Sequence, residues 1–275
     1  MMLKSSRTIQ ADRAVAHIVQ WMDQYLEQSG LDGWVVGVSG GIDSAVTSAL
    51  AAETGRPTAL LRMPIHQAQD QDQRGANHMA RLCAKWPKVS SLVVDLTPSF
   101  DGLSDALTQA SGAPFGGLSL ANSRARLRMT TLYAVAAERR ALVAGTGNKV
   151  EDFGVGFYTK YGDGGVDLSP IADLFKSDVY ALGRALGVDE AILEAPPTDG
   201  LWGDDRTDED QLGATYDELE WAMESVAAGQ GVKDHDPASR EAEVLAIYLR
   251  HHKANLHKMT AIPVCDMPSG LFTKA

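Results

Sequence analysis

Apolar positions along the chain switch between two spacings, which predict helices and strands in turn. From Asp12 to Gln28 they recur every three or four residues, the spacing of one face of an amphipathic helix, and Gly30 ends the segment. Helical spacing or composition predicts further helices over about residues 43–52, 72–86, 120–140, 176–186, 208–226 and 239–252. Between them, short continuous apolar runs predict buried strands at residues 34–38, 57–64, 90–96 and 141–148.

The order of these segments predicts the fold class. Strands that alternate with helices form βαβ units, and such units build a doubly wound, mostly parallel sheet with helices on both faces. We therefore expect an α/β protein with a single domain over residues 1–275. The glycine-rich turns after the first and fourth strands should meet at the carboxyl edge of the sheet, where such proteins bind ligands.

Three stretches rich in glycine, proline and polar residues predict loops. The first spans about residues 97–117, and its most flexible part is the sequence GAPFGG. The second covers residues 150–165, and its composition suits a loop that closes over a ligand. The third, about residues 195–211, combines proline, glycine and acidic residues, so we expect a flexible lid there.

Composition and charge argue against several classes of function. The net charge is −11 and lysine and arginine form no basic stripe, which disfavours nucleic acid as the main partner. The N-terminus has no apolar signal core and no run approaches about 18 apolar residues, so neither secretion nor a membrane span is expected. Cys83 and Cys265 form no CxxC pair, and we expect reduced cysteines in a cytoplasmic protein.

The clearest chemical signal is the turn after the first predicted strand, in the sequence WVVGVSGGIDSAV at residues 34–46. Its glycines let backbone N–H groups approach an anion at the positive end of a helix dipole, and Ser39 and Ser44 add hydroxyl donors. A carboxylate at Asp43 would repel phosphate alone, but it suits a Mg²⁺ ion shared with phosphates. The alternative is an ordinary βα turn in which Asp or Ser caps the helix.

The motifs of the chain, taken in order, resemble those of a known family. The turn lacks the GK[ST] of a Walker A loop and the GxGxxG of a dinucleotide fold, whereas SGGIDS resembles the signature of the ATP pyrophosphatase, or N-type, superfamily. Within that superfamily the chain resembles NAD synthetase from the first helix nearly to the C-terminus. Five further motifs carry the resemblance: NSRARLRM (122–129), GTGNKVE (145–151), FYTKYGDGGVDLSPIADLFK (157–176), PPTDGLW (196–202) and LHKM (256–259).

This resemblance implies an adenine nucleotide alpha hydrolase-like fold and a reaction. The reaction is the ATP-dependent amidation of deamido-NAD (nicotinic acid adenine dinucleotide) to NAD, through an adenylated intermediate with release of AMP and pyrophosphate. The implied cofactor is Mg²⁺, held by Asp43 and Glu151, and Lys176 completes the implied catalytic set. The implied ATP contacts are Gly37, Val38, Ser39, Gly40, Gly41, Ile42, Asp43, Ser44, Thr146, Lys176 and Thr198. The implied deamido-NAD contacts are Asn122, Arg126, Lys160, Asp163, Asp167, His257 and Lys258.

The nitrogen donor follows from the same resemblance. Glutamine-dependent members carry an amidase domain ahead of the synthetase, whereas only about 30 residues precede the first predicted strand here, so ammonia is expected. The motif GTGNKVE is nevertheless closer to the form in glutamine-dependent and archaeal members than to the Asp-His form of many bacterial ones, which leaves a separate glutaminase subunit open. The resemblance also implies a homodimer, with the dinucleotide near the subunit interface.

Other interpretations stay open at this point. Arg124 and Arg128 lie opposite Arg126 on a helical wheel, so we expect these two to be solvated or paired. His257 and Lys258 could simply favour the end of a helix dipole. The whole chain could be another ATP pyrophosphatase, such as a GMP synthetase-like enzyme, or a nucleotide-binding module without turnover. The ordered motifs disfavour the first of these, and the joint presence of both acidic residues and the lysine disfavours the second.

Overall fold

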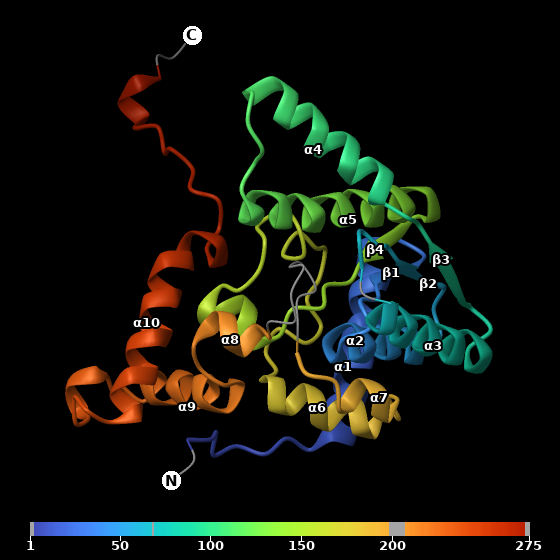
Figure 1. Cartoon of the computed structure of the whole chain (residues 1–275). Coiled ribbons are helices and arrows are strands. Elements are labelled where there is room, and N and C mark those ends of the chain that lie inside the picture. The colour runs from blue at the N-terminus through green and yellow to red at the C-terminus, as the bar shows by residue number, and fades with distance from the viewer. Residues whose placement is uncertain (1–2, 68, 198–206, 273–275) are drawn as a thin grey trace.

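A parallel β-sheet lies between two layers of helices in the computed structural model, which describes residues 3–67, 69–197 and 207–272 (Figure 1). The described residues form the strands β1 (Gly33–Gly37), β2 (Thr58–Arg62), β3 (Val89–Val93) and β4 (Ala141–Val143), in the order β3-β2-β1-β4. Each neighbouring pair is parallel. The chain runs outward from β1 to β3 and then returns to the other side of β1, so the predicted doubly wound α/β fold is confirmed.

Alternate strand residues face opposite sides of the sheet, and each side has its own apolar core. Trp34, Val36 and Leu60 belong to one core, whereas Val35 and Leu61 belong to the other. The first core is covered by α1 (Ala11–Ser29), α2 (Ile42–Glu53), α3 (Gln69–Lys85) and α6 (Lys176–Ala185), and the second by α4 (Thr97–Ser111) and α5 (Gly117–Arg139).

A third apolar core lies away from the sheet. It joins a π-helix, η1 (Val150–Val155), to α9 (Tyr216–Ala227) and α10 (Arg240–Met259), drawn in orange and red in Figure 1. Shorter helices are α7 (Glu190–Leu193), α8 (Asp208–Leu212), η2 (Val232–Asp234) and η3 (Ser269–Leu271). Among the described helices, none combines the length and the apolar character that a membrane crossing requires.

The predicted loop over residues 97–117 is wrong for most of its length. Residues 97–111 form α4, and only residues 112–116 connect it to α5. Pro98 lies in the first turn of the helix, where a missing N–H costs little, and Gly112 ends it with a φ of 73°. The helix fully buries only Phe100, but Phe100, Leu103 and Leu107 recur at helical spacing, a signal that the loop prediction overlooked.

Four other predicted segments also differ from the structure or are only partly described. The predicted loop over residues 150–165 begins with the π-helix η1, and the predicted helix over 208–226 is divided between α8 and α9 by Gly213, whose φ is 81°. The predicted lid at 195–211 overlaps α8, and its residues 198–206 lie outside the described part of the chain. The last long helix extends to Met259 instead of 252, so it includes both residues of the His-Lys pair.

We predict that His78 makes the fold sensitive to acid. Its side chain is buried between α3 and α2, with Nε2 2.9 Å from Ser48 Oγ, and burial lowers its pKa from 6.5 to about 4. His78 therefore binds a proton more tightly in the unfolded chain than in the folded one. The stability that the neutral side chain contributes to the fold is fully present above pH 6.5 and falls as the pH drops toward 4. Between pH 7.5 and 5.0 the wild type should lose about 2 kcal/mol more unfolding free energy than His78→Gln.

Urea unfolding at the two pH values measures this difference. His17→Gln, at an exposed histidine of α1, is the control and should follow the wild type. Equal pH dependence in the wild type and His78→Gln would refute the prediction.

Candidate active site

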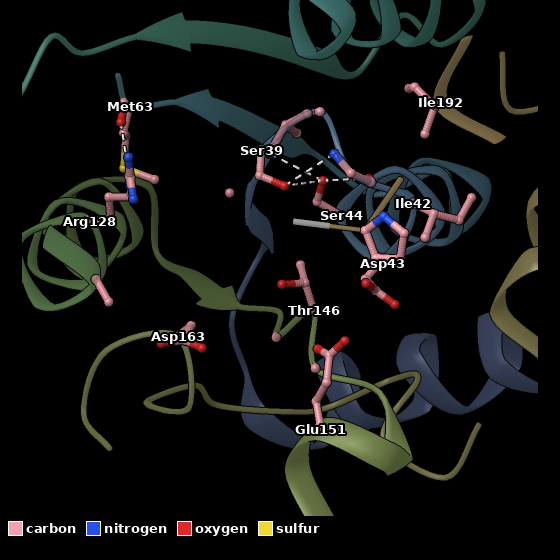
Figure 2. A pocket seen from close by; sticks show the side chains of 18 of the residues that line it. Ser39, Ile42, Asp43, Ser44, Met63, Arg128, Thr146, Glu151, Asp163 and Ile192 are labelled. Atoms are coloured by element: carbon pink, nitrogen blue, oxygen red, sulfur yellow. Dashed lines mark hydrogen bonds between the residues drawn. The ribbon is translucent and has the colours of Figure 1, made fainter. Parts of the chain in front are cut away.

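Hydrogen bonds made by two serine hydroxyls stabilise the turn between β1 and α2 (Figure 2). Ser44 Oγ accepts the N–H of Ser39 at 3.1 Å and donates to the carbonyl of Gly41 at 3.0 Å. Ser39 Oγ in turn accepts the N–H of Gly41 at 3.3 Å. Gly40 has a φ of 87°, a conformation that glycine adopts without strain. These bonds hold the turn open beside the N-terminus of α2, where a helix dipole favours an anion.

An ion cluster joins three distant segments of the chain beside this turn. Lys176 Nζ, from the start of α6, lies 2.5 Å from Asp43 Oδ2 of α2 and 3.0 Å from Glu151 Oε1 of η1. The lysine side chain is only 4% exposed. Burial lowers the pKa of Lys176, but the charges of Asp43 and Glu151 outweigh this and raise it above its ordinary value. Lys176 therefore keeps its positive charge inside the protein.

Asn148 fixes the two carboxylates relative to each other. This residue is fully buried, and its Nδ2 donates to Asp43 Oδ1 at 3.2 Å. Its Oδ1 accepts the backbone N–H groups of Val150 at 3.0 Å and Glu151 at 3.2 Å, in the first turn of η1. One amide thus ties the start of α2 to the π-helix that carries the second carboxylate.

The cluster opens into a cavity of about 260 Å³. The turn residues 37–44 and Thr146 line one side of it, together with the three ionised groups. On the opposite side, Arg128 of α5 donates from Nε to the Met63 carbonyl at 3.0 Å and from a terminal nitrogen to Gln67 Oε1 at 3.1 Å. Burial and the neighbouring Arg124 lower the pKa of Arg128 to about 10, so the guanidinium stays charged at neutral pH.

A further carboxyl lines the cavity at Asp163. It accepts the N–H of Thr159 at 3.0 Å within a turn that follows η1. Burial raises the pKa of Asp163 to about 6, and the charge of Glu151 adds to the rise. The cavity therefore combines a phosphate-type turn, a lysine, a guanidinium and oxygen ligands of the kind that hold hard cations.

Comparison with known proteins identifies the family. Residues 14–261 match the family described as NAD synthase. The chain belongs to the NAD synthase family.

Individual relatives cover most of the chain. The NH(3)-dependent NAD(+) synthetase of Methanococcoides burtonii is 36% identical over 246 residues, which is 88% of this chain and 90% of the relative. Among solved structures, an NMN synthetase from Francisella tularensis has a TM-score of 0.81 and 31% identity, covering 94% of this chain and all of that one. An NAD+ synthetase from Burkholderia pseudomallei has a TM-score of 0.69 and 30% identity, covering 93% and 92%. The fold is accordingly of the adenine nucleotide alpha hydrolase-like type.

The ATP contacts expected from the NAD synthase resemblance gather in one place. Residues 37–44, Thr146 and Lys176 all line the cavity. Thr198, the remaining residue of that set, lies outside the described part of the chain. The three residues expected to be catalytic also share this cavity, and they contact one another through the lysine.

The residues expected to contact deamido-NAD are more dispersed. Asp163 lines the cavity, whereas Asn122 Oδ1 accepts the hydroxyl of Thr159 at 2.7 Å. Arg126 is exposed, and its Nε donates to the Lys160 carbonyl at 3.3 Å. Asp167 has both oxygens occupied, because Oδ1 accepts the Tyr133 hydroxyl at 3.0 Å and Oδ2 accepts the Val143 N–H at 2.8 Å. These residues lie within the segment 156–167 beside the cavity or contact it.

Side chains of helix α10 bind the backbone at the end of η1 and at the start of this glycine-rich segment. His252 Nδ1 lies 2.7 Å from the Gly154 carbonyl, and Asn255 Nδ2 donates to the Val155 carbonyl at 2.9 Å. Lys258 Nζ donates to the carbonyls of Gly156 and Tyr158, both at 2.8 Å. His257 takes part through its own carbonyl, which accepts Lys160 Nζ at 2.9 Å. The His-Lys pair therefore anchors the segment in this structure.

Three residues of the site were not singled out by sequence: Arg128, Asn148 and Tyr216. Arg128 was expected to be solvated or paired; it is hydrogen bonded, but it also lines the cavity, while Arg126 does not. Arg128 lies three residues after Ala125 and four before Leu132, both buried, so helical spacing places it on the inward face of α5. This spacing could have identified it as a residue of the cavity. Asn148 lies within the motif GTGNKVE, but its bond to Asp43 joins segments far apart in sequence. Tyr216, whose hydroxyl donates to Glu151 Oε1 at 2.6 Å, is marked by no local pattern.

We predict that Asn148 stabilises the site through its amide. Asn148→Ala should lower the unfolding free energy by about 1–3 kcal/mol, because two backbone N–H groups of η1 lose their buried acceptor. Asn77→Ala, at an exposed asparagine of α3, is the control and should change it by less than about 0.5 kcal/mol. Urea unfolding compares the two, and equal small effects would contradict the role assigned to Asn148.

Proposed function

We propose that this chain catalyses the ATP-dependent amidation of deamido-NAD to NAD with ammonia, releasing AMP and pyrophosphate. The observation that carries the proposal is the buried cluster of Lys176, Asp43 and Glu151 beside a phosphate-type turn. A binding module would have no use for two carboxylates and a lysine converging on phosphates. Family membership favours this reaction over that of a GMP synthetase-like enzyme.

The cavity suggests how ATP binds. The triphosphate would lie against the turn at residues 37–44, where backbone N–H groups and the α2 dipole favour negative charge. The base would lie in the part of the cavity lined by Gly37, Met63 and Leu132. Arg128 lines the same cavity and would add a hydrogen-bond donor or a flat stacking surface.

Asp43 and Glu151 fit a Mg²⁺ ion. Because one lysine nitrogen is within hydrogen-bond distance of both carboxylates, one cation can reach both. No group of three or more acidic, His or Cys residues that could hold a metal occurs among the described residues. Phosphate and water oxygens would therefore complete the shell, as Mg²⁺ favours. Asp43 and Glu151 would hold this Mg²⁺ ion, and its charge would offset the negative charge of the phosphates and of pyrophosphate.

The proposed reaction has two steps. A carboxylate oxygen of the substrate bonds to the α-phosphorus of ATP, and the bond from that phosphorus to the oxygen bridging to the β-phosphate breaks. Lys176, which remains charged, would stabilise the negative charge on the phosphates as it shifts. Ammonia then attacks the carbonyl carbon, AMP leaves, and the nitrogen releases one proton to give the carboxamide. Such chemistry depends on positioning and charge stabilisation, so no protein nucleophile is needed.

We also infer a cytoplasmic homodimer. The family resemblance implies the dimer, and exposed aromatic side chains support it. Trp21 and Tyr25 stack with ring centroids 5.9 Å apart and share a shallow groove with Phe153 and Asp167. A second subunit would cover these rings and approach Asp167, one of the expected dinucleotide contacts. The cytoplasm supplies ATP, and the acidic net charge of −11 fits no nucleic-acid partner.

A second candidate substrate is nicotinate mononucleotide. The structure from Francisella tularensis that matches this chain with a TM-score of 0.81 is an NMN synthetase. Amidation at the nicotinate carboxylate would follow the same two steps with either acceptor. The two candidates differ only in whether the protein also binds the adenylyl half of the acceptor.

We predict that the purified protein converts deamido-NAD to NAD with Mg-ATP and ammonium, and forms one AMP per NAD. Glutamine alone should not support the reaction. Comparison of kcat/KM for deamido-NAD and nicotinate mononucleotide decides between the two acceptors. Activity with glutamine only after addition of a glutaminase would point to a separate subunit, and absence of AMP with both acceptors and both nitrogen donors would refute the proposal.

We further predict that Lys176→Met lowers kcat at least 100-fold, because removal of one preorganised charge at such a site typically costs about 10²–10³ in rate. Lys85→Met removes a lysine of comparable size from a surface pair with Glu53 and should retain full activity. Unfolding midpoints recorded for both variants separate loss of chemistry from loss of fold. A folded Lys176→Met variant with a rate within threefold of the wild type would exclude the assigned role.

A further inference from the structure

A buried tyrosine lies behind the ion cluster. Tyr216 is the first residue of α9, is 6% exposed, and belongs to the apolar core formed with α10. Its hydroxyl donates to Glu151 Oε1 at 2.6 Å. Lys176 Nζ lies 4.7 Å from the centre of its ring, within the range of a cation–π contact. One side chain therefore contacts two members of the cluster from outside the nucleotide cavity.

We propose that Tyr216 is a positioning residue that orients Glu151 toward the metal site, an inference that rests on the proposed function. Glu151 Oε1 receives two donors, the Tyr216 hydroxyl and Lys176 Nζ. Oε2 receives no hydrogen bond from the described residues. Figure 2 shows the Glu151 carboxylate directed from η1 toward the space in front of Asp43. Holding one oxygen from behind fixes the rotation of the carboxylate and leaves the other for a cation.

The tyrosine is itself held rigidly enough for this role. Its backbone N–H donates to Glu209 Oε1 at 2.9 Å, and the preceding Thr215 caps α9 with Glu218 as its reciprocal partner. The hydroxyl has one proton to donate, and Asp208 Oδ2, at 3.4 Å, is farther from it than Glu151 Oε1. The proton therefore belongs to the bond with Glu151. Hydrogen-bonding partners of this kind commonly set the orientation of metal ligands.

The test removes only the hydroxyl. Tyr216→Phe keeps the ring that packs in the α9–α10 core and leaves Glu151 Oε1 with Lys176 alone. Tyr248→Phe is the matched control, because Tyr248 lies in the same core, is also 6% exposed, and its hydroxyl makes no hydrogen bond with the described residues. Mn²⁺ binding in the presence of a non-hydrolysable ATP analogue, followed by electron paramagnetic resonance, is measured alongside kcat, KM and the unfolding midpoint.

We expect Tyr216→Phe to bind Mn²⁺ about 10–100-fold more weakly than the wild type, as loss of an outer partner of a metal ligand typically does. Tyr248→Phe should match the wild type, and the KM for the nicotinate substrate should be the same in both variants. Mn²⁺ affinity of Tyr216→Phe within twofold of the wild type would overturn the proposal. An equal loss in both variants would overturn it as well, because it would reflect the core and not the hydroxyl.

Two further measurements isolate the positioning role. In a Glu151→Gln background, Tyr216→Phe should cause no additional loss of Mn²⁺ affinity, since the tyrosine acts through that carboxylate. A full second loss would contradict the proposal. The Mn²⁺ readout needs no turnover, so a wild type that binds Mn²⁺ but makes no NAD would refute the proposed function and still decide the role of Tyr216. A wild type that binds no Mn²⁺ would overturn the positioning proposal directly.

Discussion

The ammonium group of Lys176, enclosed between two carboxylates, is the interaction on which the rest of the structure depends. A charge this deeply buried is stable only when its counter-charges are in place, and removal of one partner leaves an uncompensated ion. The three charged groups come from the start of α2, from η1 and from the start of α6, so the cluster is complete only when the sheet and the third apolar core are both in place. The arrangement of the proposed catalytic groups and the packing of the fold therefore depend on the same contacts.

The sequence alone was sufficient to predict those helices and strands that bury one apolar face or one continuous apolar run. The strands and α1 follow from spacing alone, because each must hide its apolar positions. Helix α4 was missed because its stretch is rich in polar residues, although Phe100, Leu103 and Leu107 recur at helical spacing and a proline lies in its first turn. The π-helix η1 packs against α10 and α9, which no local spacing reports. The break at Gly213 has local signals, namely the glycine itself and the capping box formed by Thr215 and Glu218.

The same distinction applies to the residues of the candidate site. Residues within continuous motifs, such as Asp43, Thr146 and Glu151, could be predicted because the chain itself brings them to the carboxyl edge of the sheet. The role of Asn148, although it lies in one of these motifs, could not be predicted, because it includes a bond to Asp43 from a different segment; nor could that of Tyr216, which acts through Glu151. The dinucleotide contacts expected from family motifs surround the cavity rather than line it, apart from Asp163, and the expected subunit interface is the place where they would be completed.

The way in which α10 holds the segment 154–158 bears on how this enzyme could change during evolution. Every bond from the helix to the segment ends on a main-chain carbonyl, a group that all amino acids share. Two glycines of the segment are constrained, because a Cβ would lie 2.8 Å from Met223 Sδ at Gly154 and 2.3 Å from Asn255 Cβ at Gly156. These bonds do not depend on the side chain of Phe157, which lines the cavity, or on that of Tyr158, so either can be exchanged without loss of a backbone anchor. A lineage could in this way acquire a new acceptor preference by small steps without disturbing the ionic centre.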